Sequence, residues 1–363
     1  MNSIKVAYLI EQCWHRVPGG TAVAAVNLAE EMCRIEGIDL VGIAANHKKN
    51  PQKPIPENMK IVNSIFPRQI LYEMWNKLNI PKAENLAKSV DLVHASGGAI
   101  PPTDLPLVAT IHDLAWREEK DWFPPRGRRF AETWLDKARK AERIICPSKT
   151  TYNDLVKAGF EEQRIRIVPL GVRKKNVDKQ QVEDLLEENS INTPFVLWVG
   201  TIEPRKNIPT LLQAMQQIPE TPLVLVGPKG WESDLQPLIA PIEDRVKIIG
   251  EVDEATKHAW YRAASVFCFP SLMEGFGLPV AEAMSHGTPV VTSSTTATAE
   301  VAGDSTLLID PKSAEDIADS ITKILNKPEL AEELSEKGLE RVKKMTWEDT
   351  ALATADIYRE VAS

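Results

Sequence analysis

Residues 273–282 read Met-Glu-Gly-Phe-Gly-Leu-Pro-Val-Ala-Glu and follow an apolar run, 265–269, that is typical of a buried strand. Pro279 stands where a first-turn proline belongs, so the stretch predicts a loop that opens a short helix. Gly275 and Gly277 leave the backbone bare of side chains just before this helix. Backbone amides at a helix N-terminus suit an anion such as a phosphate. The sequence therefore predicts a strand, a bare anion-binding loop and a helix in succession.

Two carboxylates flank this loop. Glu274 stands directly before the glycines, and Glu282 lies about one turn into the predicted helix. Because helical side chains lean towards the N-terminus, the Glu282 carboxylate points back to the loop. The loop thus offers donors for a diphosphate and acceptors for sugar hydroxyls on either side.

Short apolar runs alternate with amphipathic segments on both sides of this stretch. On the N-terminal side of this stretch, the second half of the chain shows patterns typical of four strands and two helices. The strands are at 195–199, 223–226, 245–249 and 265–269, and the helices are at 207–217 and 254–263. Strands separated by helices of this length predict βαβ units with right-handed crossovers and hence a parallel sheet. The first half begins in the same way, with a strand at 4–10, a helix at 22–35 and a strand at 38–44. We therefore expect two α/β domains in series.

A dibasic pair follows the first strand of the second half. Arg205 and Lys206 precede a predicted helix at the carboxyl end of that strand. Adjacent cations there suit a diphosphate, because Arg binds in a fork and Lys acts as a point charge. An ordinary surface pair is the alternative that these two residues alone leave open.

Two features of the first half are candidates for ligand contact. Gly19 and Gly20 lie between the first strand and the first helix, where they allow a ligand to approach the backbone or simply form a tight turn. His112 ends a predicted parallel strand, the place where open α/β sheets position ligand groups. A hydrogen-bonded structural histidine is the alternative. The dinucleotide fingerprint G-x-G-x-x-G does not occur, which argues against a nicotinamide-binding protein.

Composition restricts the remaining possibilities. The chain has 363 residues, no apolar run of about 18 residues that could span a bilayer, and four cysteines without a C-x-x-C pair. The N-terminus reads as a strand and not as a signal peptide, so we expect a cytoplasmic protein. Net charge is −8, yet the first half carries an excess of Lys and Arg. The basic amphipathic segment 122–143 could contact an anionic membrane at its inner face or form an ordinary surface helix.

Within this context the motifs resemble those of retaining glycosyltransferases of family 4, which have the GT-B fold. The resemblance covers almost the whole chain. It is strongest at Gly-Thr-Ile-Glu-Pro-Arg-Lys-Asn (200–207), Pro-Ser-Leu-Met-Glu-Gly-Phe-Gly-Leu-Pro (270–279) and Glu-Val-Ala-Gly-Asp (300–304), and Ile-His-Asp-Leu (111–114) adds to it. The 200–207 pattern together with the His-Asp-Leu strand end looks most like bacterial polysaccharide mannosyltransferases.

The resemblance implies two Rossmann-like domains whose parallel sheets face a central cleft. Residues 1–172 would form the acceptor-side domain, 173–193 the linker and 194–345 the nucleotide-sugar domain, and the helix 346–363 would cross back to the first domain. The donor would bind mainly to the second domain.

The resemblance also implies roles for single residues. Glu274, Lys206 and His112 would act at the reacting centre: Glu274 on the hydroxyls of the donor sugar, Lys206 on the diphosphate, His112 near the transferred sugar. The other donor contacts would be Arg205 on the diphosphate, Glu282 on the ribose, Gly19 and Gly20 from the first domain, and the loop residues Gly275, Phe276, Gly277 and Leu278. Two departures from the family pattern are Thr201, where many members carry Arg, and Ala299, where many carry Pro.

No Asp-x-Asp motif occurs, so we expect neither a metal nor another cofactor, and Lys and Arg would replace the metal. The implied reaction moves a hexose with retained configuration, most directly mannose from GDP-mannose, to a glycan or lipid-linked acceptor; no nucleic-acid partner is expected. A UDP-glucose or other UDP-sugar donor, a nucleotide-sugar epimerase and a non-catalytic nucleotide-sugar-binding subunit are the alternatives. We expect Glu274→Ala to reduce the transfer rate far more than the stability of the fold.

Overall fold

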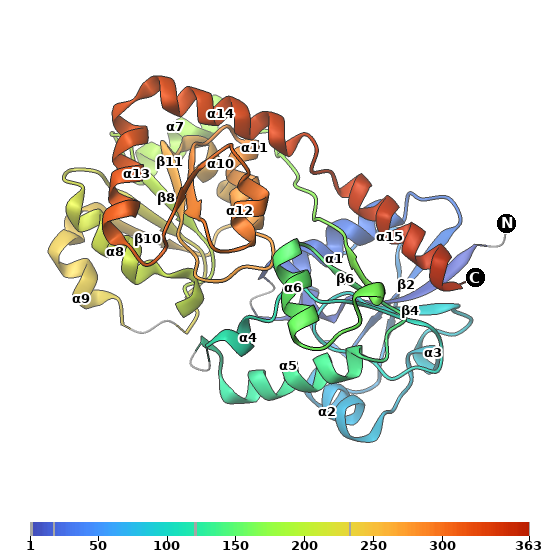
Figure 1. Cartoon of the computed structure of the whole chain (residues 1–363). Helices are drawn as coiled ribbons and strands as arrows, with labels where there is room; N and C mark the ends of the chain where they lie inside the picture. The colour runs from blue at the N-terminus through green and yellow to red at the C-terminus, as the bar shows by residue number, and fades with distance from the viewer. Residues whose placement is uncertain (1–2, 17–18, 120–121, 232–233, 363) are drawn as a thin grey trace. The chain divides into compact units, whose positions relative to one another are not determined.

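The computed structural model describes residues 3–16, 19–119, 122–231 and 234–362. The chain divides into two compact units (Figure 1). The first unit comprises Met1–Gly171 and Trp347–Ser363, and the second comprises Val172–Thr346.

In the described part of the first unit, seven parallel strands form one sheet in the order β3-β2-β1-β4-β5-β6-β7. The strands are β1 (Ile4–Leu9), β2 (Ile38–Ala44), β3 (Lys60–Asn63), β4 (Leu92–Ala95), β5 (Leu107–Thr110), β6 (Arg143–Cys146) and β7 (Ile165–Ile167). The helices are α1 (Gly19–Met32), α2 (Arg68–Leu78), α3 (Ala83–Leu86), α4 (Ala115–Glu118), α5 (Pro125–Ala138), α6 (Lys149–Lys157) and α15 (Trp347–Ala362), with 3-10 turns η1 (Glu11–Trp14) and η3 (Glu162–Arg164).

The described part of the second unit contains a sheet of six parallel strands in the order β10-β9-β8-β11-β12-β13. The strands are β8 (Val196–Val199), β9 (Leu223–Val226), β10 (Val246–Gly250), β11 (Val266–Phe269), β12 (Val290–Ser293) and β13 (Leu307–Ile309). The helices are α7 (Lys179–Glu188), α8 (Ile208–Gln217), α9 (Gln236–Ile239), α10 (Glu254–Ala263), α11 (Leu278–Ser285), α12 (Ala297–Ala302), α13 (Ala314–Asn326) and α14 (Pro328–Val342), with 3-10 turns η4 (Pro204–Lys206) and η5 (Ala240–Arg245).

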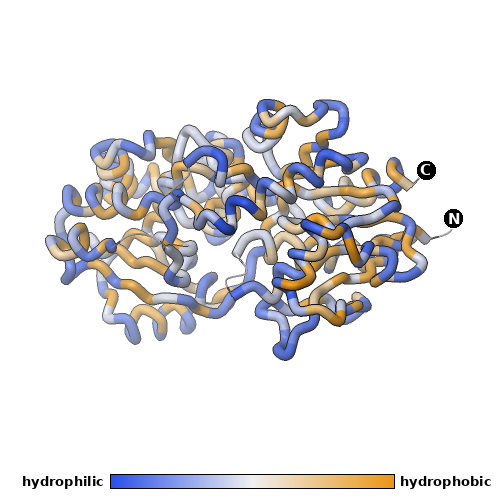
Figure 2. Tube along the Cα trace, turned by 90° about the horizontal axis from the view of Figure 1, so that it is seen from below, coloured by the Kyte–Doolittle hydropathy of each residue, from blue (hydrophilic) through white to orange (hydrophobic). Residues whose placement is uncertain are grey.

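Both sheets are built as the alternation of strands and helices predicted. The central strands β4, β8 and β11 are wholly buried, and β1 is buried from Val6 onward, as expected for parallel strands covered by helices on both faces. Hydrophobic stretches alternate with hydrophilic ones along the chain (orange and blue in Figure 2). The expectation of two Rossmann-like domains is confirmed.

Three segments differ from the expected elements. The apolar pattern of residues 68–88 predicts one helix, but the segment forms two, because Asn79, which follows the last residue of α2, has φ of +53° and Pro81 comes soon after. The short strand β3 lies in a region, 47–67, whose sequence shows no clear period. The segment expected as a linker, 173–193, contains α7, whose Leu185 is buried.

The last helix, α15, belongs to the first unit although the chain reaches it from the second. Its Tyr358 hydroxyl lies 2.6 Å from Nδ1 of the buried His94, and its Thr350 hydroxyl donates to the Pro169 carbonyl at 2.8 Å. Among the residues described, no helix combines the length and the apolar character that crossing a bilayer requires.

Candidate active site

The loop after β8 carries the dibasic pair and is fixed to the neighbouring strand β11. Pro204 begins the 3-10 turn η4, and Asn207 ends it with φ of +58°, a conformation that Asn tolerates better than most residues. The Asn207 side-chain amide donates to the carbonyls of Pro270 (3.0 Å) and Pro311 (2.6 Å). Arg205 and Lys206 are thereby held at the carboxyl end of the sheet.

The structure brings Arg205, Lys206 and Glu274 together. Lys206 Nζ lies 2.6 Å from Glu274 Oε1, and Arg205 Nη1 lies 3.0 Å from Glu274 Oε2. Arg205 Nε also lies 2.7 Å from Glu203 Oε1. Glu203, Lys206 and Glu274 are buried. These four residues, Glu203, Arg205, Lys206 and Glu274, form what we call the Glu274 cluster.

The charges in this cluster stabilise one another. Burial by itself would raise the pKa of Glu274, but the neighbouring Arg205 and Lys206 charges outweigh it and lower that pKa to about 2. Burial, together with the Arg205 charge, lowers the pKa of Lys206. The Lys206 ammonium also lies 4.8 Å from the centre of the Phe269 ring. Glu274 is therefore an acceptor at neutral pH and not a proton donor.

The glycine loop has the shape that its sequence predicts. Gly277 precedes α11 with φ of +106°, and a Cβ atom there would lie 2.7 Å from Thr298 Cγ2. Gly275, Phe276 and Gly277 are buried and Leu278 is half-buried. In the first turn of α11, Pro279 has no N–H group, and the N–H groups of Val280 and Ala281 donate to the Gly277 carbonyl at 3.0 and 3.3 Å. The Leu278 N–H is therefore the donor that this turn can offer to an anion. A diphosphate is the kind of group that such a terminus binds.

Glu282, one turn into α11, has different partners. Its carboxylate accepts hydrogen bonds from Lys257 Nζ (2.9 Å) and from the Tyr261 hydroxyl (3.0 Å), both on α10. Lys257 also contacts Glu254 at 3.0 Å. Our sequence reasoning missed Lys257 and Tyr261. Their i, i+4 spacing puts them on one helix face, but only the packing of α10 against α11 shows which residue they meet.

Glu254, His258 and Glu282 resemble a set of metal ligands, since their ligand atoms lie within 4.8 Å of one another. The Lys257 ammonium lies within 3.0 Å of both carboxylates and supplies a positive charge there. His258 Nδ1 lies 2.7 Å from His286 Nε2. The lysine thus already compensates the two carboxylates without an ion.

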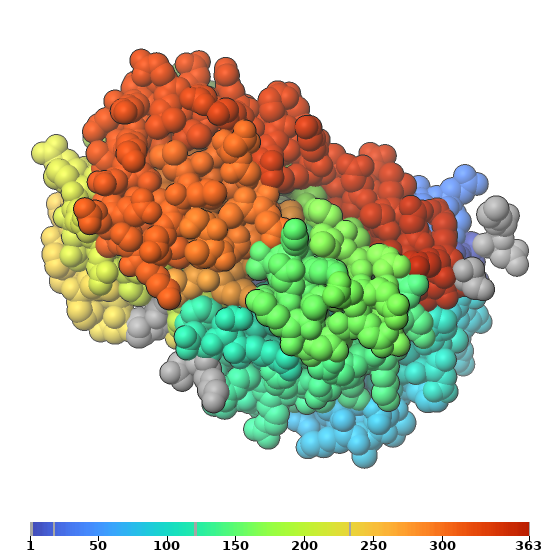
Figure 3. Space-filling view, in the orientation of Figure 1, coloured from blue at the N-terminus to red at the C-terminus, as the bar shows by residue number. Residues whose placement is uncertain are grey.

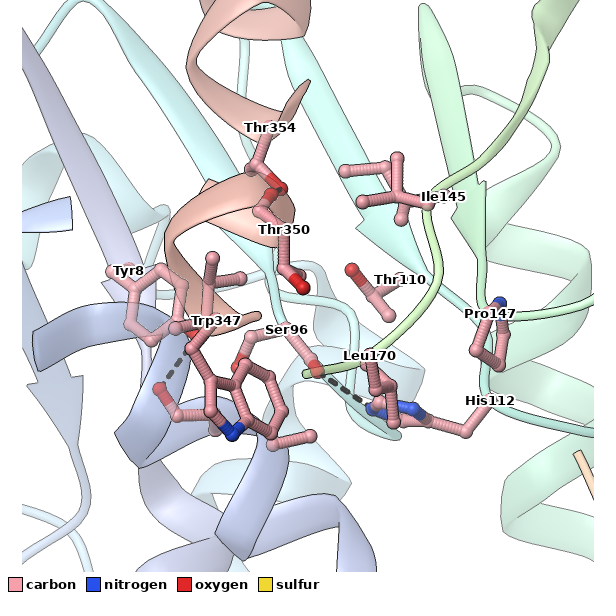
Figure 4. Close-up of a pocket in the computed structure, with 14 residues that line it drawn as sticks. Tyr8, Ser96, Thr110, His112, Ile145, Pro147, Leu170, Trp347, Thr350 and Thr354 are labelled. Atoms are coloured by element: carbon pink, nitrogen blue, oxygen red, sulfur yellow. Dashed lines mark hydrogen bonds between the residues drawn. The ribbon is translucent and has the colours of Figure 1, made fainter. Parts of the chain in front are cut away.

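His112 lies in the first unit, directly beyond β5. Its Nε2 lies 3.2 Å from the Ser96 carbonyl, and burial lowers its pKa, so the ring is neutral at pH 7. Figure 4 shows His112 at the edge of a pocket to which Tyr8 and Trp347 of α15 also contribute. The Thr350 and Thr354 hydroxyls that face this pocket donate to carbonyls, so the pocket is lined by satisfied groups.

Gly19 and Gly20 are the first residues of α1 and are exposed. Gly19 has φ of +61°, and among the described residues, its chain neighbours left aside, no atom lies within 4 Å of the place of a Cβ atom. The glycine is therefore required by backbone conformation and not by crowding. The open space beside it is compatible with a ligand, and a plain tight turn explains the same geometry.

Family models match both halves of the chain. Residues 18–175 match the model described as "Glycosyltransferase Family 4", and residues 182–341 match "Glycosyl transferases group 1". The O-antigen chain mannosyltransferase B of Escherichia coli is 33% identical over 265 residues, which cover 69% of this chain and 70% of that protein. The MMP alpha-(1->4)-mannosyltransferase of Mycolicibacterium hassiacum is 27% identical over 275 residues, which cover 70% and 65%.

Solved structures share the fold. The sucrose-phosphate synthase from Thermosynechococcus elongatus has a TM-score of 0.78 at 23% identity over 98% of both chains. The Anabaena protein Alr3699/HepE in complex with UDP-glucose has a TM-score of 0.78 at 17% identity, covering 98% of this chain and 100% of that chain. The two parallel sheets therefore form a GT-B fold.

Proposed function

Because this chain belongs to glycosyltransferase family 4, we propose that it transfers mannose from GDP-mannose to a hydroxyl of a glycan or lipid-linked acceptor. We also propose that the anomeric configuration is retained and that no metal or other cofactor takes part. Mannosyltransferases recur among the relatives at 27–33% identity, which supports mannose as the transferred sugar.

The Glu274 cluster is the observation that carries this proposal. Two cations hold one ionised carboxylate at the carboxyl ends of β8 and β11, where α/β sheets bind ligands. A carboxylate oxygen accepts more than one hydrogen bond, so Glu274 would also accept one from a sugar hydroxyl. Arg205 and Lys206 would face the diphosphate, and Glu282 would accept hydrogen bonds from the ribose.

In the proposed reaction the bond between the anomeric carbon and the diphosphate oxygen breaks, and a bond to the acceptor oxygen forms on the same face. The departing phosphate oxygen takes the acceptor's proton, so no side chain has to act as an indispensable general base. Arg205, Lys206 and the first turn of α11 stabilise the negative charge of the leaving group. The neutral His112 would contact the transferred sugar from the first unit, and the backbone of Gly19 and Gly20 would approach the diphosphate.

Donor hydrolysis without acceptor tests the proposal. Purified protein is incubated with GDP-mannose, UDP-glucose and further nucleotide-sugars, and NMR follows the anomer that is released. We expect GDP-mannose to be hydrolysed with retained configuration. Selective turnover of a UDP-sugar would correct the donor, an epimerised nucleotide-sugar would indicate an epimerase, and donor binding without turnover even after an acceptor screen would indicate a binding subunit.

Two variants make this measurement specific to the cluster. Glu274→Gln keeps the shape of the side chain and should reduce turnover by about 10²–10³-fold, the usual cost of losing one group that stabilises a transition state. Glu132→Gln is the matched control, because Glu132 is also an ion-paired glutamate but binds Arg117 in the first unit. Turnover by Glu274→Gln equal to that of the control would remove Glu274 from the mechanism.

A lipid-linked acceptor would require the enzyme to work at a membrane. We therefore extend the proposal to peripheral contact between the first unit and an anionic membrane surface at the cytoplasmic face. The excess of cationic residues on α5 supports this part of the proposal.

A further inference from the structure

A row of polar residues follows the central strands of the first unit. In the sheet order β2-β1-β4-β5 the carboxyl ends of these strands are neighbours, at the edge where open α/β sheets bind ligands. The polar residues that come shortly after these four strand ends are His47, Glu11, Gln12, Ser96 and His112, which we call the strand-end row. The proposed reaction uses only His112 of this row.

His47, which follows β2, is held in one orientation. Its Nε2 lies 2.9 Å from Glu11 Oε2, and its ring stacks on that of Trp14 at 4.7 Å with 6° between the planes. Glu11 Oε2 also accepts from the Ala45 amide at 2.7 Å, and because a carboxylate only accepts, the proton of the neutral His47 ring is on Nε2. Nδ1 is then an acceptor, and the side chain is 17% exposed. His47 thus offers a fixed acceptor at this edge of the sheet.

Gln12 turns its side chain towards β4. The Ser96 hydroxyl donates to the Leu9 carbonyl and is left to accept from Gln12 Nε2 at 2.8 Å, which fixes the orientation of the amide. His112 Nε2 donates to the Ser96 carbonyl at 3.2 Å (Figure 4). A Cβ atom on Gly97 would lie 3.3 Å from His112 Nε2 and 3.7 Å from Gln12 Nε2. Gln12 is therefore close to the histidine that we propose to contact the sugar.

The acceptor atoms in this row indicate the chemistry of a ligand. Gln12 Oε1 is buried and has no hydrogen-bond partner among the residues that the structure describes, so a ligand that donates a hydrogen bond would stabilise it. Glu11 Oε1 likewise has no partner in the described part of the chain, so the Glu11 carboxylate is compensated at Oε2 only. Sugar hydroxyls donate hydrogen bonds, whereas a phosphate brings negative charge and acceptor oxygens.

We infer that the strand-end row binds the acceptor and that it selects a neutral saccharide over a phosphate group. His47 and Gln12 would accept hydrogen bonds from the saccharide hydroxyls. Glu11, whose side chain is only 1% exposed, is a positioning residue that fixes the tautomer and the orientation of His47. The inference rests on the proposed function, since it names the chemical class of the acceptor for that reaction. Lys48 and Lys49 are exposed beside His47 and favour an anion instead, so the test includes an anionic probe.

Titration of the full chain with a neutral and an anionic probe tests this inference. Saturation-transfer NMR, with and without GDP, compares an α-linked mannobiose with inositol 1-phosphate, and we expect the mannobiose to bind more tightly. His47→Phe keeps a ring against Trp14 and removes both ring nitrogens, and Gln12→Leu removes the amide. Each should weaken mannobiose binding by about tenfold, as expected for one lost hydrogen bond in a buried site. Thermal unfolding shows that each variant is folded.

Two further variants separate positioning from general stability. Glu11→Gln should weaken mannobiose binding about as much as His47→Phe, and the double variant should lose no more than either single variant, because Glu11 acts through His47. Glu360→Gln is the matched control, since Glu360 is also ion-paired, with Arg143 at 2.5 Å and Arg166 at 3.0 Å. It lies on α15 (dark red in Figure 3), and Arg143 begins β6, so the pair is at the opposite, amino edge of the sheet.

The inference is overturned if the wild-type chain gives no saturation transfer to mannobiose, if inositol 1-phosphate binds more tightly, or if Glu360→Gln loses as much affinity as His47→Phe. Additive losses from Glu11→Gln and His47→Phe would overturn the positioning role of Glu11. The titration measures binding and does not depend on turnover. Absence of donor hydrolysis would contradict the proposed reaction, whereas absence of mannobiose binding contradicts this inference, so the two failures are distinguishable.

Discussion

At the scale of single residues, the pairing of Lys206 with Glu274 changes the expectation for substitutions at this site. The sequence motif alone predicts that Glu274→Ala reduces the transfer rate far more than the stability of the fold. The buried carboxylate is held by two cations, so removing it deprives Lys206 of its paired carboxylate, while Arg205 keeps its contact with Glu203. Stability and turnover should therefore both depend on Glu274.

We predict that Glu274→Gln and Lys206→Met each lower the free energy of unfolding by about 3 kcal/mol, because each breaks a buried pair. The double variant should lose less than the sum of the two, with a coupling of about 1–3 kcal/mol. Urea unfolding followed by circular dichroism measures the three values. Additive losses would mean that the two side chains do not stabilise each other.

Residue identities at the site could be predicted better than their partners. Glu274, Arg205, Lys206 and Glu282 follow from the loop motifs, which are local in sequence. Lys257 and Tyr261 do not, because their role depends on how α10 packs against α11. The functional roles of all these residues stay predictions.

We predict that Lys257 orients Glu282 for the donor. Lys257→Met should raise KM for the nucleotide-sugar by about tenfold while kcat changes less, because the ribose lies away from the reacting carbon. Tyr261→Phe removes one neutral hydrogen bond and should have a smaller effect. Glu254→Gln, which would act on Glu282 through Lys257, should have a smaller effect still. Steady-state kinetics with donor in varied concentration give this order, and a fall in kcat alone would contradict it.

At the scale of elements, the start of α11 depends on one glycine. Gly277 has φ of +106°, and the space for a Cβ atom is filled by the Thr298 methyl group of α12. Any other residue at position 277 would therefore have a strained backbone, and its Cβ atom would also clash with Thr298.

We predict that Gly277→Ala lowers the free energy of unfolding by about 2 kcal/mol and weakens donor binding. Adding Thr298→Ser removes the methyl group but keeps a hydroxyl for the hydrogen bond to Ser293. The double variant should recover part of the loss, because the contact is relieved and the strained backbone remains. Thermal unfolding and donor titration measure both effects; full recovery would mean that backbone strain contributes nothing.

Most elements were predictable, since strands β8, β9 and β11 and helices α8 and α10 follow from clear periodicity. The elements that the sequence did not predict, β3 and α7, were missed for physical reasons. Strand β3 is short and pairs only at the sheet edge, so its residues show little alternation. The helix α7 lies in a charged stretch with only Leu185 buried, which reads like a linker.

At the scale of the whole molecule, the two units are not two consecutive stretches of chain. Helix α15 completes the first unit after the second has been traversed. It buries Trp347, Ala351, Ala355 and Tyr358 against that unit, and the Tyr358 hydroxyl contacts the buried His94. The local sequence near residue 347 does not indicate against which sheet this helix packs. The expectation that it crosses back to the first domain came from the family resemblance.

We predict that truncation after Thr346 unfolds the first unit and leaves the second folded. Without α15, the apolar surface that this helix covers becomes exposed, and His94 Nδ1 loses the Tyr358 hydroxyl. The strand pairing of the second sheet, β8 to β13, does not involve α15 and remains. Hydrogen exchange with mass spectrometry should show lost protection in β1 and β4 and unchanged protection in β8 and β11. Tyr358→Phe provides the graded control, since it removes one buried hydrogen bond and should cost about 1 kcal/mol without unfolding the unit. Equal loss of protection in both units would show that they unfold as one cooperative body, and α15 would then stabilise the molecule as a whole.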